Sequence, residues 1–127
     1  MLNAVPEVLW RPEPTTAQAT SLAKFARFAR ERRGVSVAEL DYSSLHAWSV
    51  GDPDAFWSAA AEFLDVRFHI PPTGALASAR MPGAEWFPGS TLNYAEHALS
   101  AGPGRGDDDV ALVFVREDGL ERLVTYG

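Results

Sequence analysis

The sequence predicts an α+β chain, in which a helical N-terminal part with irregular proline-rich segments is followed by a C-terminal β-hairpin. Apolar residues recur with helical spacing in residues 16–33 and 53–64, and eight of the nine prolines lie outside these two segments. After residue 109 the apolar residues become continuous for six positions, which is typical of a buried strand. A chain of 127 residues is long enough for one domain with one core.

Composition excludes several classes of function. The net charge of −6 and the sequence pI of about 4.9 argue against a nucleic-acid-binding module, which is usually basic. The chain has no cysteine, which excludes a disulfide scaffold, a thiolate zinc site and a cysteine nucleophile, and fits a cytoplasmic location. It contains no run of about 18 apolar residues and no basic segment leading into an apolar one at the N-terminus. We therefore expect neither a membrane span nor a secretory signal.

Residues 1–14 are expected to form an extended arm, because Pro6, Pro12 and Pro14 disfavour helix in the residues before them. The first helix is then predicted over residues 16–33, with Thr15 or Thr16 as its N-cap. Its apolar stripe consists of Leu22, Phe25, Ala26 and Ala29.

A cluster of basic residues lies at the end of this helix. Arg30, Arg32 and Arg33 occupy the last turn, where cations are favoured by the helix dipole, and Gly34 follows as the stop. The cluster, which also includes Arg27, is therefore interpreted as a helix terminus rather than as a phosphate site.

Two further helices are predicted before the irregular middle of the chain. A short helical turn is expected at 43–48, and a longer helix at 53–64 with Asp52 as cap, Pro53 in the first turn and Asp54 near the positive end. The wide apolar face of the longer helix predicts that it is mostly buried, with Trp57 deep in the core. Residues 65–89 should be largely irregular because they contain four prolines.

The last helix and the hairpin follow from capping and turn signals. Asn93 and Glu96 form a capping-box pattern, and Gly102 is expected to end the helix. Residues 102–109 form a Gly/Pro/Asp linker, 110–115 a strand covered on both faces, 117–119 a loop with Gly119, and 120–126 the return strand. Because a lone hairpin is marginal in water, we expect it to begin a larger sheet.

No residue pattern in the chain predicts catalysis. The loop at 102–106 lacks the Gly-Lys-Ser/Thr ending of a phosphate loop and precedes Asp107, Asp108 and Asp109, which match no calcium-loop spacing. The three histidines have no ligand spacing, and the serines lack a nucleophile-elbow context: His46, His69, His97, Ser43, Ser44 and Ser90. We therefore assign no catalytic, cofactor-binding or metal-binding residue.

The order of motifs resembles the N-terminal region of acetyl-CoA synthetase-type enzymes, and within them the acetoacetate–CoA ligase branch. The motifs are Leu9-Trp10-x-Pro12-x-Pro14, Glu31-Arg32-Arg33-Gly34, Tyr42-x-x-Leu45-x-x-Trp48-Ser49-Val50, Pro53-x-x-Phe56-Trp57, and Met81-Pro82-Gly83-Ala84-x-Trp86-Phe87-Pro88-Gly89 leading to Leu92-Asn93-Tyr94-Ala95-Glu96.

This resemblance implies an adenylate-forming ligase that uses ATP, Mg²⁺ and CoA, with acetoacetate as the substrate and the remainder of the same chain as partner. It implies a division into an arm (1–14), a helical apron (15–101), a linker (102–109) and a hairpin (110–127) that begins the sheet of a larger α/β AMP-binding domain. The phosphate loop and catalytic lysine would lie downstream, so the segment alone is expected to be inactive. The alternative is a stand-alone helical interaction module with an aromatic docking face.

Overall fold

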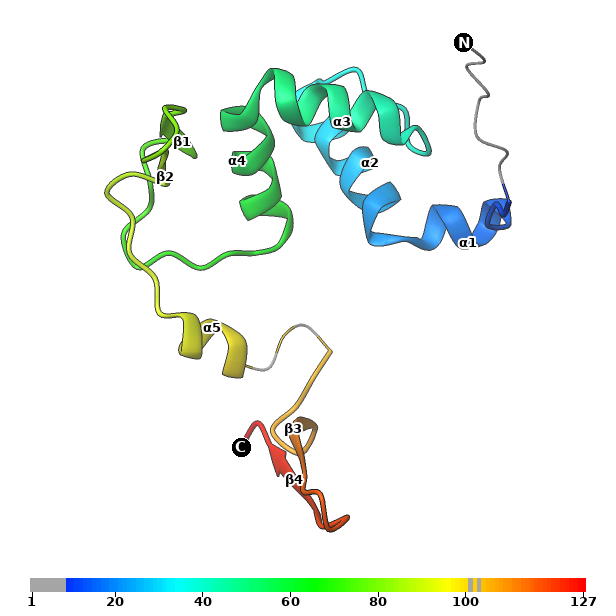
Figure 1. The fold of residues 1–127 in the computed structure, drawn as a ribbon, viewed down its shortest axis with the longest axis vertical. Helices are drawn as coiled ribbons and strands as arrows, with labels where there is room; N and C mark the ends of the chain where they lie inside the picture. Colours follow the sequence, from blue (N-terminus) through cyan, green and yellow to red (C-terminus); the bar gives the residue numbers. More distant parts are fainter. Residues whose placement is uncertain (1–8, 101, 103) are drawn as a thin grey trace. The chain divides into compact units, whose positions relative to one another are not determined.

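The computed structural model describes residues 9–100, 102 and 104–127, and Figure 1 labels their helices and strands. The chain divides into two compact units, and each is described by itself. Unit 1 comprises the residues up to Asp65 together with Thr73–Pro88, and unit 2 comprises Val66–Pro72 with Gly89–Gly127. The predicted arm lies partly outside the described residues, and 9–13 have no regular structure.

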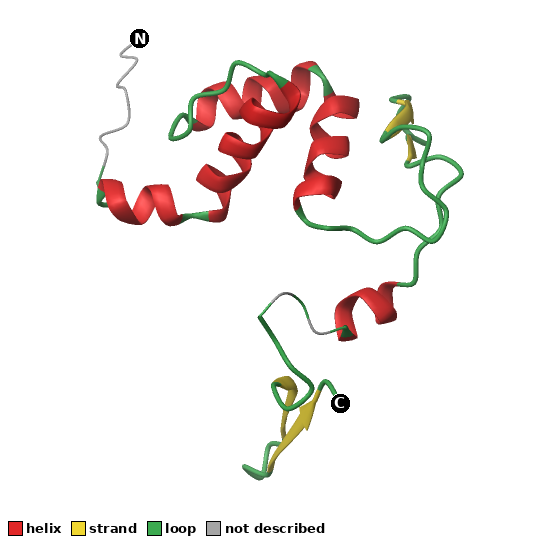
Figure 2. Ribbon diagram, turned by 180° about the vertical axis from the view of Figure 1, so that it is seen from behind, coloured by secondary structure: helices red, strands yellow, loops and turns green. Residues whose placement is uncertain are grey.

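Five helices and two antiparallel strand pairs make the described part of the chain α+β, as predicted (Figure 2). The elements of unit 1 are α1 (Pro14–Ala19), α2 (Ser21–Arg33), α3 (Tyr42–Gly51), α4 (Pro53–Phe63), β1 (Leu76–Ser78) and β2 (Glu85–Trp86). Those of unit 2 are α5 (Tyr94–Leu99), β3 (Val110–Val115) and β4 (Glu121–Thr125). Among the described residues, none of the helices combines the length and the apolar character of a membrane span.

The predicted first helix is in fact two helices, separated at Thr20. The backbone of Thr20 is extended, its hydroxyl donates to the carbonyl of Ala17 (2.7 Å), and it accepts the N–H of Ala23 (3.2 Å). The prediction of Thr15 or Thr16 as N-cap is therefore wrong. Both lie inside α1, which begins at Pro14 because proline is well suited to the first turn of a helix.

The ends of the next helices follow local capping chemistry. Gly34 ends α2 in the left-handed conformation (φ 64°), as predicted, and its N–H donates to Arg30 O (3.1 Å). Asp41 caps α3 by accepting the N–H groups of Ser43 and Ser44 (3.0 and 3.2 Å), so this helix is longer than the predicted 43–48 turn. Asp52 caps α4 through Ala55 N–H (3.1 Å), as predicted.

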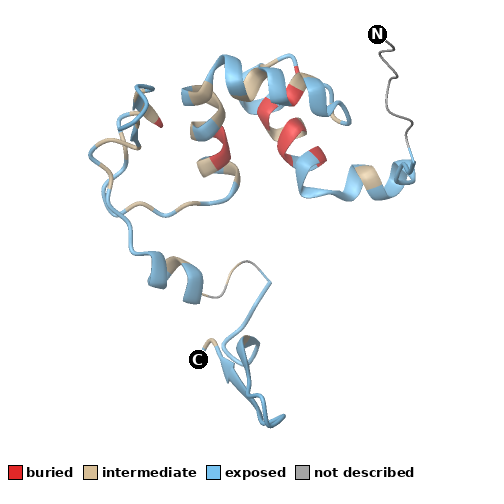
Figure 3. Ribbon diagram, viewed as in Figure 1, coloured by how far each residue is buried: buried red, intermediate tan, exposed pale blue. Residues whose placement is uncertain are grey.

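The core of unit 1 is small and is built where α2, α3 and α4 meet (Figure 3). Phe25 lies at its centre, 7% exposed, with its ring 5.3–6.1 Å from those of Trp48, Phe56 and Phe63. The remaining buried members are Ala26, Ala29, Val37, Leu45, Ala59 and Ala60. Three members of the predicted stripe on α2 are buried as predicted, namely Phe25, Ala26 and Ala29. The fourth, Leu22, is 48% exposed, and Ala23 is buried in its place.

The prediction that α4 is mostly buried is wrong. Only Ala59 and Ala60 of this helix are buried, whereas Trp57 is 46% exposed and Leu64, which follows the helix as its C-cap, is 64% exposed. The reason is geometric, because a helix packed on two neighbours through one side leaves the opposite side open. The sequence predicts a wide apolar face on this helix, but it does not indicate which other segments of the protein cover that face.

Residues 65–89 are largely irregular, as predicted, but they contain a short ribbon. Leu76 pairs with Trp86 and Ser78 with Glu85, with an irregularity between the pairs. Beside the ribbon, Phe87 N–H donates to Ala75 O (2.8 Å).

In unit 2, Asn93 caps α5 by accepting the N–H of Glu96 (3.1 Å). The helix ends at Leu99 rather than at the predicted Gly102, because Ser100 already adopts an extended backbone. The hairpin matches its predicted position, with Leu112 opposite Val124 and a loop glycine, Gly119, at φ 82°.

Candidate functional site

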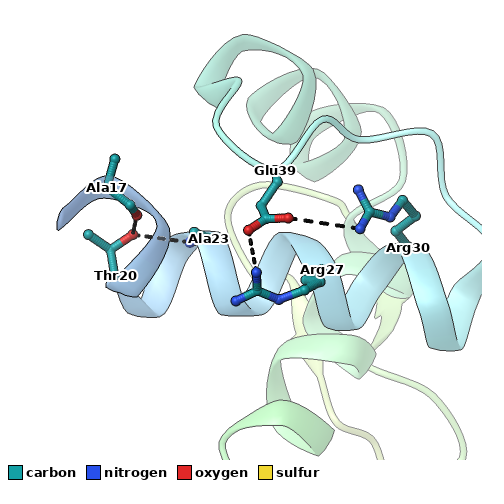
Figure 4. Close-up of polar contacts among 6 residues, drawn as sticks. All are labelled: Ala17, Thr20, Ala23, Arg27, Arg30 and Glu39. Carbon is teal, nitrogen blue, oxygen red and sulfur yellow. Dashed lines mark hydrogen bonds and ion pairs between the residues drawn. The ribbon is translucent and has the colours of Figure 1, made fainter. Parts of the chain in front are cut away.

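The arginines at the end of α2 are engaged by carboxylates. Glu39 contacts Arg27 through one oxygen and lies 3.9 Å from Arg30 through the other (Figure 4). Arg33 Nη2 lies 2.7 Å from Glu62 Oε2 on α4. Pairs this exposed add little stability each, but they orient the loop after α2 and the end of α4. Three of the four arginines therefore face carboxylates, which disfavours a phosphate at this position.

Asp54 has a role that the sequence analysis missed. Its predicted place in the first turn of α4 is confirmed, but its Oδ1 also accepts the N–H groups of Ala75 and Leu76, both at 2.7 Å. Ala75 is fully buried, so its N–H depends on this protein acceptor. Asp54 therefore fixes the β1–β2 ribbon on α4. The sequence carried no signal for this contact across 21 and 22 residues.

The histidines are less isolated than their spacing indicated. His69 Nε2 lies 2.8 Å from Glu96 Oε2, so the Glu96 carboxylate binds His69 instead of completing the capping box. A cavity of about 10 Å³ adjoins them, and its remaining lining residues are Arg67, Asn93 and His97. The buried Nδ1 of His97 has no hydrogen-bond partner among the described residues. This space accommodates at most one water molecule and excludes a nucleotide or an acyl group.

Polar groups of the glycine- and aspartate-rich linker form hydrogen bonds within the linker and with the last two residues of the chain. Gly106 N–H donates to Asp109 Oδ2 (2.7 Å), and Gly127 N–H donates to the Asp107 carbonyl (2.9 Å). Arg105 Nη1 donates to Tyr126 Oη (2.6 Å). Gly106 N–H thus points at a carboxylate, which is unfavourable for phosphate binding. Within residues 9–100, 102 and 104–127, no three His, Cys, Asp or Glu side chains gather in a way that could hold a metal ion.

The serines at the start of α3 serve the helix cap. Ser44 Oγ donates to Asp41 O (3.0 Å) and accepts the N–H of Ala38 (3.1 Å). The backbone N–H of the neighbouring Ser43 donates to the Asp41 carboxylate. Ser44 Oγ therefore binds backbone groups at both of these contacts, which is typical of a helix cap rather than of an activated nucleophile.

An apolar groove of about 210 Å³ lies beside α2 and the loop that follows it. Its lining includes Pro12, Leu22, Ala26, Leu40, Tyr42 and Leu45. Two carboxylates also border it, but Glu39 is held by arginines and Asp41 by the N–H groups of α3. A specific ligand site needs a few polar groups free to orient the ligand, and both carboxylates that border this groove are already engaged.

The aromatic side chains fall into an inner and an outer group. The inner group is the cluster around Phe25. In the outer group, the rings of Trp57 on α4 and Trp86 on β2 meet edge to face, with centroids 6.0 Å apart, and both side chains are nearly half exposed. This pair therefore places two large apolar rings together at the surface of unit 1.

Comparisons of the sequence and of the structure with known proteins find the same group of enzymes, the CoA synthetases. Residues 42–98 match the family model described as the acetyl-coenzyme A synthetase N-terminus. The chain is 35% identical to an acetoacetyl-coenzyme A synthetase of Rhizobium meliloti over 93% of its length, and 33% identical to an acetyl-coenzyme A synthetase of Chlorobaculum tepidum over 68%. It superimposes on the structure of the acetoacetyl-CoA synthetase from Streptomyces lividans with a TM-score of 0.82 and 42% identity, over 95% of this chain. The chain spans only 17%, 13% and 18% of these three proteins, respectively.

Proposed function

We propose, because this chain belongs to the acetyl-CoA synthetase family and corresponds to its N-terminal region, that it is the N-terminal structural segment of an ATP-dependent acid–CoA ligase acting on acetoacetate. The observation that carries the proposal is the match of both sequence and fold along nearly the whole chain. Its division into arm, helical apron, linker and hairpin (1–14, 15–101, 102–109 and 110–127) is part of the same proposal.

The reaction proposed for the whole ligase has two steps. A carboxylate oxygen of acetoacetate attacks the α-phosphorus of Mg²⁺-bound ATP and expels pyrophosphate, which leaves an acetoacetyl-adenylate. The thiolate of CoA then attacks the acyl carbon, forming the thioester and releasing AMP. We assign no site for ATP, CoA or Mg²⁺ to this segment, and no three His, Cys, Asp or Glu side chains gather for a metal ion among its described residues. Its only lysine, Lys24, lies exposed on α2.

The role proposed for the segment is therefore architectural. The first strand of the hairpin, β3, carries apolar side chains on both faces, with Leu112 and Phe114 alternating with Val113 and Val115, all more than half exposed. A strand that is apolar on both faces is typical of a sheet covered on both sides. We propose that the hairpin begins the sheet of the AMP-binding domain, and that the ligase is cytoplasmic.

Acetoacetate is favoured over acetate by the extent of the similarity. The acetoacetyl-CoA synthetases named above match 93% and 95% of the chain, whereas the acetyl-coenzyme A synthetase matches 68%. The test is the kcat/KM of the full-length enzyme for the two acids, because this ratio measures differential transition-state binding. A preference for acetate would overturn the substrate while leaving the adenylation chemistry in place.

The isolated 127-residue chain is proposed to be inactive. Mixed with ATP, Mg²⁺, acetoacetate and CoA, it should release pyrophosphate no faster than a protein-free control. Turnover above that control would contradict the architectural role. The alternative, a stand-alone interaction module, requires a reading frame that encodes no adenylation domain beyond Gly127.

A further inference from the structure

We propose that the Asp118–Gly119 pair, in the loop between β3 and β4, is a site of spontaneous isoaspartate formation, and that the closed turn of the hairpin restrains this modification. An aspartate that precedes a glycine is especially susceptible, because a residue without a side chain leaves its backbone nitrogen unhindered. Asp118–Gly119 is the single Asp-Gly pair in the sequence, which contains no Asn-Gly pair. The proposal does not depend on the reaction proposed for the ligase.

The modification is a ring closure followed by hydrolysis, and it needs no oxidant or cofactor. The backbone nitrogen of Gly119 attacks Cγ of Asp118, and one carboxyl oxygen leaves as water with the proton of that nitrogen and a proton from solvent. Water then opens the resulting succinimide. Breaking the bond between the nitrogen and Cγ restores aspartate. Breaking the bond between the nitrogen and the main-chain carbonyl carbon leaves the backbone running through Cβ and Cγ, which is isoaspartate.

The geometry of the hairpin favours this susceptible pair. Gly119 N–H donates to the Arg116 carbonyl, and Arg116 N–H donates to the Leu120 carbonyl, both at 2.9 Å. With Gly119 at φ 82°, this is the arrangement of a three-residue hairpin loop that ends in a left-handed residue. A Cβ on Gly119 would meet nothing within 4 Å, so the backbone conformation, and not a lack of space, favours glycine here. Aspartate is itself favoured in turns.

The same turn engages both reacting groups. The nitrogen of Gly119 is held by its hydrogen bond to the Arg116 carbonyl. The carboxylate of Asp118 lies 2.7 Å from Arg116 Nη2 through Oδ2 and accepts the N–H of Leu120 (3.3 Å) through Oδ1. Ring closure has to break the first contact and turn the carboxyl group out of the others. The reaction is therefore expected to proceed from the locally opened hairpin rather than from the closed one.

Isoaspartate at this position would disturb the hairpin. The side chain of Asp118 is 55% exposed, so the water that opens the succinimide reaches it. Isoaspartate lengthens the backbone by one carbon inside the loop that follows the last strand pair, Val115 opposite Glu121. The lengthened loop no longer fits the three-residue geometry, because the hydrogen bonds that close it depend on the loop length. Asp118 is thus the position at which ageing of the protein would loosen β3 from β4.

Ageing of the full-length protein at physiological temperature and pH, folded or unfolded in guanidinium chloride, tests the proposal. A protease that cleaves before aspartate but not before isoaspartate then leaves the bond between Glu117 and Asp118 uncut, and mass spectrometry quantifies the uncut peptide. In the unfolded protein Asp118 should be modified faster than Asp54, which precedes an alanine. Folding should slow the modification of Asp118 by about tenfold or more. Equal rates at Asp118 and Asp54 in the unfolded protein would overturn the site, and equal rates at Asp118 in the folded and unfolded protein would overturn the restraint.

Substitution of Arg116 tests the contribution of its side chain. Arg116→Ala should accelerate the modification in the folded protein by about threefold, a modest effect because an exposed ion pair stabilises little. Arg116→Lys, which keeps a cation, should retain most of the restraint. Arg122→Ala, at a position opposite Phe114 in the same hairpin, is the control and should leave the rate unchanged. Equal rates for Arg116→Ala and Arg122→Ala would refute the role of the Arg116 side chain, and so would an acceleration by Arg116→Ala that persists in guanidinium chloride. If Arg116→Ala does not fold, the comparison of the folded and unfolded parent protein decides.

Discussion

The carboxylate of Asp54 contributes both to the start of a helix and to a contact between segments distant in the sequence. It sits in the first turn of α4, where a negative charge is favoured, and it also accepts the N–H groups of Ala75 and Leu76. The first role is local, so the Asp-Pro-Asp sequence predicts it. The second role depends on how the chain returns to α4 after residue 65, and no periodicity encodes that path. A polar residue explained by its local position can therefore still have a distant partner.

Replacement of Asp54 tests this second role. Asp54→Ala should lower the free energy of unfolding by about 1–3 kcal/mol, because the buried N–H of Ala75 loses its acceptor. Asp54→Asn should lose less, since an amide oxygen still accepts. Urea denaturation followed by tryptophan fluorescence measures both changes.

The control for this pair is Asp108→Ala, at an exposed position in the linker. Its effect should stay within about 0.5 kcal/mol. Should Asp54→Ala and Asp108→Ala destabilise equally, the contacts with Ala75 and Leu76 would carry no stability.

At the scale of the elements, some helix ends were predictable from a few adjacent residues. Gly34 and Asp52 have the predicted roles because capping depends on a few adjacent residues. The break at Thr20 was missed because Thr15 and Thr16 offered the same side chain earlier, and only the structure shows which hydroxyl caps. The burial of Trp57 was overestimated, since an apolar face does not reveal what covers it. The contact between His69 and Glu96 joins residues that are 27 positions apart, so no local sequence pattern predicts it.

Gly34 gives a matched test of helix termination. Gly34→Ala should destabilise the chain by about 1–2 kcal/mol, because an alanine pays a steric penalty at φ 64°. Gly51→Ala is the control, since Gly51 is the last residue of α3, has no positive φ, and has open space around its Cβ position. It should be neutral or slightly stabilising. Thermal unfolding followed by circular dichroism compares the two, and a Gly34→Ala melting temperature equal to that of Gly51→Ala would contradict the capping role.

At the scale of the whole molecule, the two units differ in what stabilises them. Unit 1 has a core centred on Phe25, with three helices around it. In the hairpin of unit 2, all large apolar residues of both strands are at least 41% exposed. A two-stranded hairpin without a covered face is marginally stable in water. The two units should therefore open with different free energies when the chain is studied alone.

Hydrogen exchange measured by mass spectrometry checks this difference. In the isolated 127-residue chain, amides of α2 and α4 should be protected by at least tenfold more than those of β3 and β4, because only the helices surround a core. In the full-length ligase the hairpin amides should become as protected as the helical ones, since the sheet proposed to continue from them would pair their edges and cover both faces. Hairpin amides that exchange equally fast in both proteins would contradict the proposed place of residues 110–127 in the AMP-binding domain. Because the helical amides are compared within the same samples, general unfolding of the chain would be recognised separately.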